Sequence, residues 1–127
     1  MMKTLFILMN HELLPTQHDD ALHSLHIEKT VILSDQHWSQ IPSEDSSIKP
    51  FVLHYETRLK QEAKKGDYLL VQGDFGATYH MVRFAKSLGM VPIYATTKRV
   101  VTQKMIEGSV ITQREFSHVR FRKYEEA

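Results

Sequence analysis

The segment Tyr68-Leu69-Leu70-Val71-Gln72-Gly73-Asp74-Phe75-Gly76-Ala77-Thr78 decides the fold that this chain is expected to adopt. Four mostly apolar residues meet a glycine turn, and a helical pattern follows as far as Leu88. Glycines at 73 and 76 would allow positive φ and the close approach of a ligand, and the first helical turn presents unpaired N–H groups to anions. The alternative is an ordinary turn between strand and helix that binds nothing. The segment therefore predicts a βα unit with a candidate anion site.

The flanking sequence repeats this alternation of strand and helix. Apolar runs without polar interruption are typical of strands covered on both faces, and apolar residues spaced by three and four are typical of helices. We expect strands at 5–9, 27–33, 67–71 and 91–95, and helices at 16–25, from 48 to 66 and from the glycine loop to 89. Thr16 with Asp19 resembles a capping pair for the first helix. Right-handed crossovers then give a doubly wound sheet with strand order 2-1-3-4.

The C-terminal part has a different character. Residues 100–106, 110–116 and 119–121 are predicted to be extended, with a turn at Glu107-Gly108. We expect one α/β domain over residues 1–127, with a mostly parallel sheet sandwiched by helices and a C-terminal β-hairpin extension.

Composition limits the kinds of partner. The net charge of +1 with neutral histidines disfavours long nucleic acid and suits a small anion better. No stretch approaches the length of a membrane span, so we expect no membrane association. The chain has no cysteine, which rules out disulfides and is consistent with a cytoplasmic protein.

Polar residues are expected to follow three of the predicted strands. Asn10 and His11 follow the first strand, the glycine loop follows the third, and Thr96-Thr97-Lys98-Arg99 follows the fourth. In strand order 2-1-3-4 a crevice opens where the first and third strands end. His118, Arg120 and Arg122 alternate with apolar residues and would project from one face of a strand. Either basic cluster could instead be a solvated edge.

Several other readings of the sequence are disfavoured. Asp74-Phe75-Gly76 spells a kinase magnesium motif, but the chain is too short for a kinase and lacks a catalytic loop. The glycine loop lacks the Lys-Ser/Thr ending of a phosphate-binding loop and the third glycine of a dinucleotide site. His23 and His26 lie three apart, but no third ligand completes a zinc site nearby. We therefore expect no metal and no cofactor.

A resemblance narrows the hypothesis. Residues 66–79, Tyr94-Ala95-Thr96-Thr97-Lys98-Arg99 and His118-Val119-Arg120-Phe121-Arg122 resemble the small stand-alone ring nucleases (Csx type) of type III CRISPR systems. That family has a CARF-like, Rossmann-like domain that binds cyclic oligoadenylates across a homodimer. The resemblance implies that the chain binds cyclic tetra-adenylate and cleaves it to linear di-adenylate with a 2′,3′-cyclic phosphate. Its cleavage would switch off antiviral signalling.

Physical reasoning assigns roles to the matched positions. Lys98 or Arg99 would stabilise charge on the phosphoryl oxygens, and His11 could transfer a proton near neutral pH without a metal. The other expected ligand-binding residues supply backbone N–H groups, polar side chains or positive charge; they are Asn10, Gln72, Gly73, Asp74, Phe75, Gly76, Ala77, Thr78, Thr96, Thr97, His118, Arg120 and Arg122. Two rival functions stay open. One is a protein that senses or sequesters the messenger without cutting it, and the other is a general RNA-binding protein.

Overall fold

The first four strands lie in the order that the sequence predicted. The computed structural model describes residues 3–127, and within them the sheet has the order β2-β1-β3-β4-β5. Its strands are β1 (Lys3–Leu8), β2 (Ile27–Ile32), β3 (Tyr68–Val71), β4 (Val91–Ile106) and β5 (Ser109–Lys123). Strands β1 to β4 are parallel to one another, and the central strands β1 and β3 carry the buried apolar runs expected of strands covered on both faces. The order places β1 beside β3 at the centre of the sheet.

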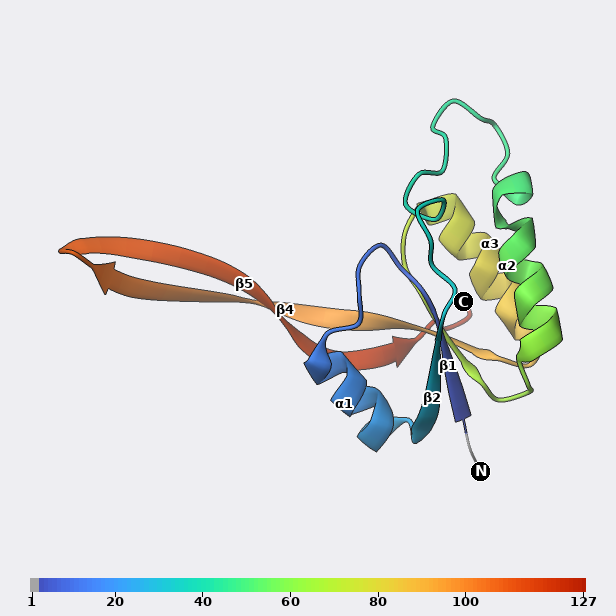
Figure 1. Cartoon of the computed structure of the whole chain (residues 1–127), viewed down its shortest axis with the longest axis horizontal. Helices are drawn as coiled ribbons and strands as arrows, with labels where there is room; N and C mark the ends of the chain where they lie inside the picture. Colours follow the sequence, from blue (N-terminus) through green and yellow to red (C-terminus); the bar gives the residue numbers. More distant parts are fainter. Residues whose placement is uncertain (1–2) are drawn as a thin grey trace.

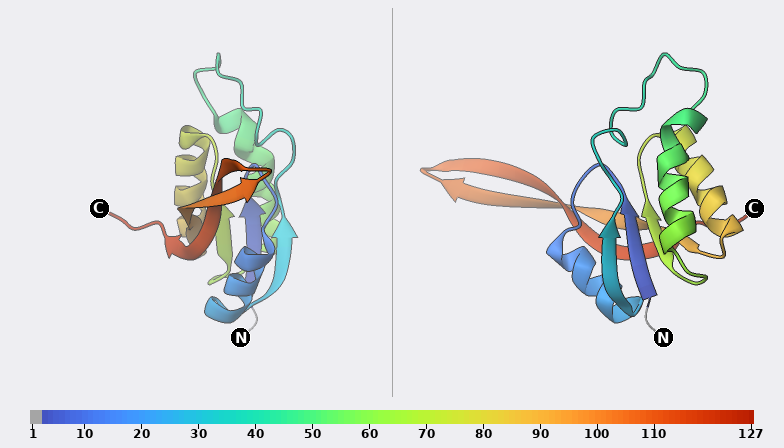
Figure 2. Two further views of the ribbon diagram at one scale, coloured as in Figure 1. Left: turned by 90° about the vertical axis from the view of Figure 1, so that its left-hand side faces the viewer. Right: turned by 45° about the vertical axis from the view of Figure 1, so that its right-hand side comes forward.

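Three helices cover the parallel strands, as the sequence predicted. They are α1 (Pro15–Ser24), α2 (Lys49–Glu62) and α3 (Phe75–Ser87). Helix α1 lies on one face of the sheet, and α2 and α3 lie together on the other (Figures 1 and 2). Two separate apolar clusters fill the space between sheet and helices, one on each face. No helix among residues 3–127 is long and apolar enough to cross a membrane.

The sheet is mixed rather than mostly parallel, which corrects the expectation from sequence. Strand β4 continues through Thr96–Arg99 to Ile106 and pairs antiparallel with β5 along almost its whole length. The threonines and valines of this segment favour a continued strand over a loop. We call Arg99–Phe116 the arm, with Glu107-Gly108 as its tip and the rest of the chain as the body. Figure 1 shows the arm projecting from the body as a twisted two-stranded ribbon.

Helix α1 begins differently from the predicted cap at Thr16. Leu14 is the N-cap residue, and Pro15 is the first helical residue. The side chain of Gln17 accepts the Leu14 backbone N–H at 2.9 Å and is buried itself. Proline at the first helical position needs no hydrogen-bond partner, so it shifts the start of the helix by one residue.

Candidate ligand-binding groove

A large groove lies beside the end of β3, between α3, β4 and the C-terminal residues. It has a volume of about 1120 Å³, and its lining residues are Gln72, Gly73, Phe75, Thr78, Tyr79, Val82, Arg83, Lys86, Tyr94, Tyr124, Glu125, Glu126 and Ala127. This volume exceeds the usual size of a pocket for one drug-sized ligand. Part of the predicted glycine loop therefore faces an open cavity.

Aromatic rings are the main apolar feature of the groove. Phe75 is 94% exposed and Tyr79 is 64% exposed. They lie four residues apart on α3, so they share one side of the helix. Across the groove, the rings of Tyr94 and Tyr124 pack with their centroids 4.7 Å apart. Two exposed rings on α3 thus face a groove that already contains two more.

Positive charges lie next to these rings. Arg83 donates to the Tyr79 hydroxyl at 3.0 Å, and its guanidinium lies 5.8 Å from the centre of that ring. The Arg122 guanidinium lies 5.7 Å from the Tyr94 ring centre and donates to its hydroxyl at 3.2 Å. A guanidinium is attracted to the face of an aromatic ring, and its N–H groups can also donate to a phosphate. The groove therefore combines stacking surfaces with positive charge.

The C-terminal residues close one side of the groove. Tyr124 donates its hydroxyl to the Val71 carbonyl at 2.6 Å, and burial raises the pKa of this phenol to about 12, so it remains neutral. Glu126 lies 3.4 Å from the ammonium of Lys86. The chain thus places its own carboxylate on one of the cations of the groove.

The glycine loop does not adopt the conformation expected from sequence. Neither Gly73 nor Gly76 has positive φ; among the glycines of residues 3–127, positive φ occurs at 66, 89 and 108. A side chain at position 73 would meet the indole nitrogen of Trp38 at 2.7 Å, so this glycine makes room for Trp38. Asp74 caps α3 by accepting the Ala77 N–H at 2.9 Å. A bound anion would have to compete with this carboxylate.

The remaining residues of the loop have mainly structural contacts. Gln72 accepts the Ala95 N–H through its side chain at 2.7 Å, beyond the last pairing of β3 with β4. The buried Thr78 hydroxyl has no hydrogen-bond partner among the described residues. Gln72, Gly73, Phe75 and Thr78 nevertheless line the groove.

The predicted crevice between β1 and β3 is filled. Trp38 is 1% exposed and donates its indole N–H to the Gln72 carbonyl at 2.9 Å. Asn10 and His11 line a second, smaller cavity of about 390 Å³ that shares no lining residue with the groove. His11 lies 3.1 Å from the Glu12 carbonyl through Nδ1, which is the backbone contact weighed as its alternative role. The two predicted halves of the crevice are therefore separate.

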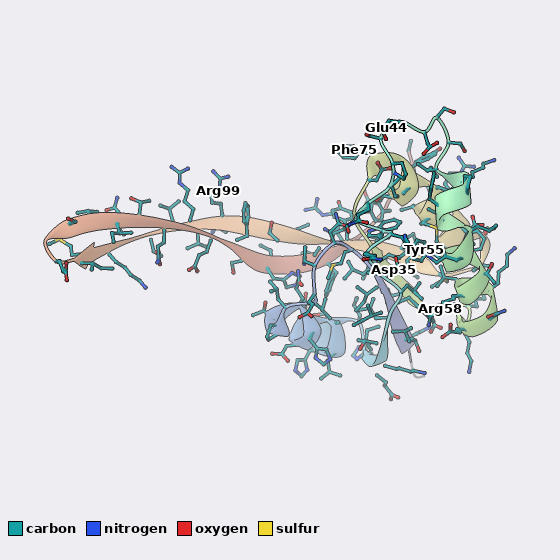
Figure 3. The ribbon with its side chains drawn as sticks, turned by 45° about the horizontal axis from the view of Figure 1, so that its top comes forward. Asp35, Glu44, Tyr55, Arg58, Phe75 and Arg99 are labelled. Carbon is teal, nitrogen blue, oxygen red and sulfur yellow. The ribbon has the colours of Figure 1, made fainter. Side chains whose placement is uncertain are left out.

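Thr96, Thr97, Lys98 and Arg99 do not follow a strand end, because all four lie within β4. The Thr96 hydroxyl donates to the Arg120 carbonyl across the ladder at 3.0 Å. Figure 3 shows Arg99 projecting from the ribbon, well away from Phe75. Neither Lys98 nor Arg99 lines the groove within one copy of the chain.

A β-bulge divides the predicted basic stripe. The register shifts between Thr96 and Thr97, so His118 pairs with Thr97 and Arg120 with Thr96. His118 consequently turns toward α1, where its side chain is 3% exposed and contacts Asp20 at 2.8 Å. Arg122 lies over Tyr94, beside the groove. Strict alternation fails because a bulge adds one unpaired residue to a strand.

The histidines do not gather into a metal site. His80 contacts Glu56, His54 contacts Asp35 and His118 contacts Asp20, each pair having one carboxylate. The part of the chain that the structure describes holds no group of three or more His, Cys, Asp or Glu residues suited to a metal.

Asp35 is part of a polar cluster that was not predicted from sequence. It accepts the Tyr55 hydroxyl at 2.6 Å and the backbone N–H of Trp38, and His54 and His37 lie close by (Figure 3). Burial raises the pKa of Asp35, but these hydrogen bonds and positive charges outweigh burial and hold the pKa below its usual range. The cluster fixes the loop after β2 onto α2.

Nine of the thirteen groove residues were not predicted as site residues from sequence; they are Tyr79, Val82, Arg83, Lys86, Tyr94, Tyr124, Glu125, Glu126 and Ala127. They come from α3, β4 and the C-terminal segment, so no local motif contains them. One local signal was present. Tyr79 and Arg83 lie four residues apart on α3, the spacing that places two side chains beside each other.

Comparison with known proteins gives a family. The chain is 40% identical over 126 residues to the "Uncharacterized protein MJ1673" of Methanocaldococcus jannaschii, covering 97% of this chain and 98% of that protein. No solved structure matches the chain significantly. Because residues 3–122 match the family described as "Uncharacterized protein MJ1673 family", the chain belongs to that family.

Proposed function

We propose that the protein binds a cyclic oligoadenylate, cyclic tetra-adenylate first, in the groove beside α3. The observation that carries the proposal is the exposure of Phe75 and Tyr79 at the edge of a cavity that also holds positive charge. Exposed aromatic rings provide stacking surfaces for nucleobases, and each stacked base contributes about 1–3 kcal/mol. A nucleotide ligand uses both features of the groove.

Phosphate groups account for the charges. Arg83 and Lys86 line the α3 side of the groove, and Arg122, which does not itself line it, lies over Tyr94 beside the groove. Charge-assisted hydrogen bonds from such cations to phosphate are stronger than neutral ones. With bases on the rings of α3 and phosphates between the two sides, a compact oligonucleotide would occupy the groove.

A short oligonucleotide is favoured over a single nucleotide and over a long nucleic acid for two reasons. The groove volume of about 1120 Å³ suits several linked nucleotides better than one. The net charge of +1 disfavours a long duplex or strand. The resemblance of residues 66–79 to the ring nucleases supplies the specific messenger. As a cysteine-free binder of such a messenger, the protein would act in the cytoplasm.

The separation of the expected catalytic residues makes binding the primary proposal. Lys98 and Arg99 lie on or beside the arm, and His11 lines the smaller cavity. Bound messenger would be withdrawn from its effectors without being cut. Ring cleavage is our second proposal, and Arg83 and Lys86 are the cations that the groove offers for it. In-line attack by a ribose 2′-hydroxyl would then need only orientation and charge stabilisation.

Titration calorimetry with cyclic tetra-adenylate, linear tetra-adenylate and a linear 20-nucleotide RNA tests the proposal. Phe75→Ala and Tyr79→Ala should each weaken binding of the cyclic ligand on the order of 5- to 150-fold, the loss of one stacking surface. Leu53→Ala, on α2 and 60% exposed, is the matched control and should bind normally. Equal affinity of all variants for cyclic tetra-adenylate would show that the ligand does not bind in the groove. Preference for the linear RNA with a steep salt dependence would indicate a general RNA-binding protein.

Chromatography of the same mixtures, with and without EDTA, distinguishes capture from cleavage. Intact ligand after long incubation supports sequestration. Linear di-adenylate with a cyclic phosphate, formed in EDTA and lost in Arg83→Ala or Lys86→Ala, supports cleavage in the groove. Products with a 5′-phosphate that require Mn²⁺ would contradict the metal-independent mechanism.

A further inference from the structure

The arm exposes apolar side chains that no other part of residues 3–127 covers. Its two strands each contribute eight residues, Arg99–Ile106 and Ser109–Phe116, and extend about 26 Å at the usual rise per residue. Its exposed large apolar residues are Val100, Val101, Met105, Ile106, Val110, Ile111 and Phe116. A lone two-stranded hairpin is only marginally stable in water. The ribbon therefore needs a partner surface.

Pairing in the ladder assigns these side chains to two faces. Met105 pairs with Val110, and Arg99 pairs with Phe116 six residues away on the same face. Val101 lies between these pairs, also on this face. We call the side chains of Val101, Met105, Val110 and Phe116 the arm patch. The opposite face carries three such side chains, Val100, Ile106 and Ile111, against four in the arm patch.

Charge is distributed unevenly along the arm. On the face of the arm patch both cations, Arg99 and Arg114, lie in the half near the base, whereas the tip carries the carboxylate of Glu107. Glu107 has φ of 52°, a conformation that asparagine or glycine adopts more easily. The tip therefore retains a negative charge at a position where a less strained residue was available.

We propose that two copies of this chain associate through their arm patches, packed antiparallel about a two-fold axis. Antiparallel packing places each Glu107 near the Arg99 of the other copy, while parallel packing would bring the two Arg99 side chains together. The contact goes beyond ligand binding, because it uses no residue that lines the groove.

A second copy fits the arm better than RNA does. The arm contains three basic residues, Arg99, Lys104 and Arg114, and two acidic ones, Glu107 and Glu115, which leaves a net charge of +1. Seven exposed large apolar side chains outnumber these cations. RNA-binding surfaces need a dense positive charge that follows the backbone.

Light scattering of the nucleotide-free protein across a concentration series tests this contact. The wild type should have the mass of two chains at micromolar concentration. Combined Val101→Ser, Met105→Ser, Val110→Ser and Phe116→Ser should weaken association at least 100-fold. The matched control, Val100→Ser, Ile106→Ser and Ile111→Ser on the opposite face, should remain a dimer. A monomeric wild type, or equal loss of association in both variants, would overturn the proposal, as would linear RNA that binds wild type but not the arm-patch variant.

Cross-linking tests the antiparallel arrangement, because the chain has no natural cysteine. Positions 105 and 116 of one arm lie about 20 Å apart along the ribbon, too far for a disulfide. Met105→Cys with Phe116→Cys should give an oxidised dimer, whereas either single variant should not. Efficient cross-linking of both single variants would show parallel arms and refute the arrangement. Glu107→Asn relieves the backbone strain but should weaken association several-fold; unchanged association would exclude the proposed ion pair.

These measurements need no nucleotide. A dimer that binds no cyclic oligoadenylate would support the arm contact and refute only the proposed function. A monomer that binds the ligand would support the proposed function and refute only the arm contact.

Discussion

The body and the arm use similar apolar residues in opposite environments. In the body, Leu8 and Leu69 have no exposed surface, and Ile93 at the start of β4 is 1% exposed. In the arm, Met105 of the same strand is 74% exposed and its neighbour across the sheet, Val110, is 61% exposed. Side-chain type does not explain this difference. What differs is whether another element of the chain covers the strand, so the body buries its apolar side chains within one copy and the arm leaves them exposed.

Trp38 should give the largest effect of a single change. Trp38→Ala removes a buried ring and its hydrogen bond to the Gln72 carbonyl, and it should lower the free energy of unfolding by about 3–5 kcal/mol. Phe116→Ala in the arm should change it by less than about 0.5 kcal/mol in dilute protein. Urea unfolding followed by circular dichroism measures both. Similar losses in the two variants would break the comparison between body and arm.

The two loop glycines provide a second, smaller contrast. Gly73→Ala would place a Cβ 2.7 Å from the Trp38 indole nitrogen and should cost about 1–3 kcal/mol. At Gly76 the nearest atom to a new Cβ is the Asp74 carboxylate at 3.5 Å, and alanine is the better helix former. Gly76→Ala should therefore unfold at the same or a higher temperature. A lower melting temperature for Gly76→Ala than for Gly73→Ala would show that the turn depends on Gly76 rather than on Gly73.

The sequence predicted the body far better than the arm. Helix α2 and strand β3 follow from local apolar spacing, and right-handed crossovers then leave few possible strand orders. The path of β4 beyond Ala95 could not be read in the same way, since Thr96-Thr97-Lys98-Arg99 suits either a polar loop or an exposed strand. Only pairing with β5, which is a contact distant in sequence, selects the strand.

The candidate site was predicted only in part, for the same reason. Residues 72–78 form one segment, and several of them line the groove. Tyr94 and Tyr124 are 30 residues apart in the chain and meet only after β5 has folded back along β4. Trp38 fills the expected crevice from a loop that has no periodic pattern, and the β-bulge that turns His118 toward α1 has no signature in the alternation of residues.

Acid should act on the junction between body and arm. Burial raises the pKa of Asp20. Hydrogen bonds from Ser24 and His118 and the charges of His118 and Arg120 together lower it by more than burial raises it, so the pKa lies below its usual value. A lowered folded-state pKa contributes stability above about pH 4 that is lost as the pH falls through the folded-state value. Asp20→Asn should therefore flatten the fall in melting temperature between about pH 5 and pH 2. An unchanged acid profile would show that this contact contributes little.

Removing the side-chain charge of Glu126 should give the smallest effect. Glu126 lies 3.4 Å from Lys86 at the groove and is 82% exposed, so their ion pair is weak. Glu126→Gln should raise the affinity for cyclic tetra-adenylate by no more than about fivefold, and the mass of the nucleotide-free protein should not change. Glu125→Gln, which removes the neighbouring charge, is the control. A gain of the same size in both variants would indicate a general effect of charge rather than release of Lys86.

Strand β4 is one continuous segment that forms a wall of the groove through Tyr94 and one half of the arm as far as Ile106. The β-bulge at Thr96 and Thr97 lies between these two parts of the strand. If occupancy of the groove changes the angle between the two parts of β4, then ligand binding in the groove and self-association through the arms are thermodynamically linked. A nucleotide that tightens self-association by some factor must itself be held more tightly, by that same factor, once the arms have met. The apparent affinity of the protein for the nucleotide would then depend on protein concentration. A titration at one protein concentration would measure this affinity for one ratio of monomer to dimer only.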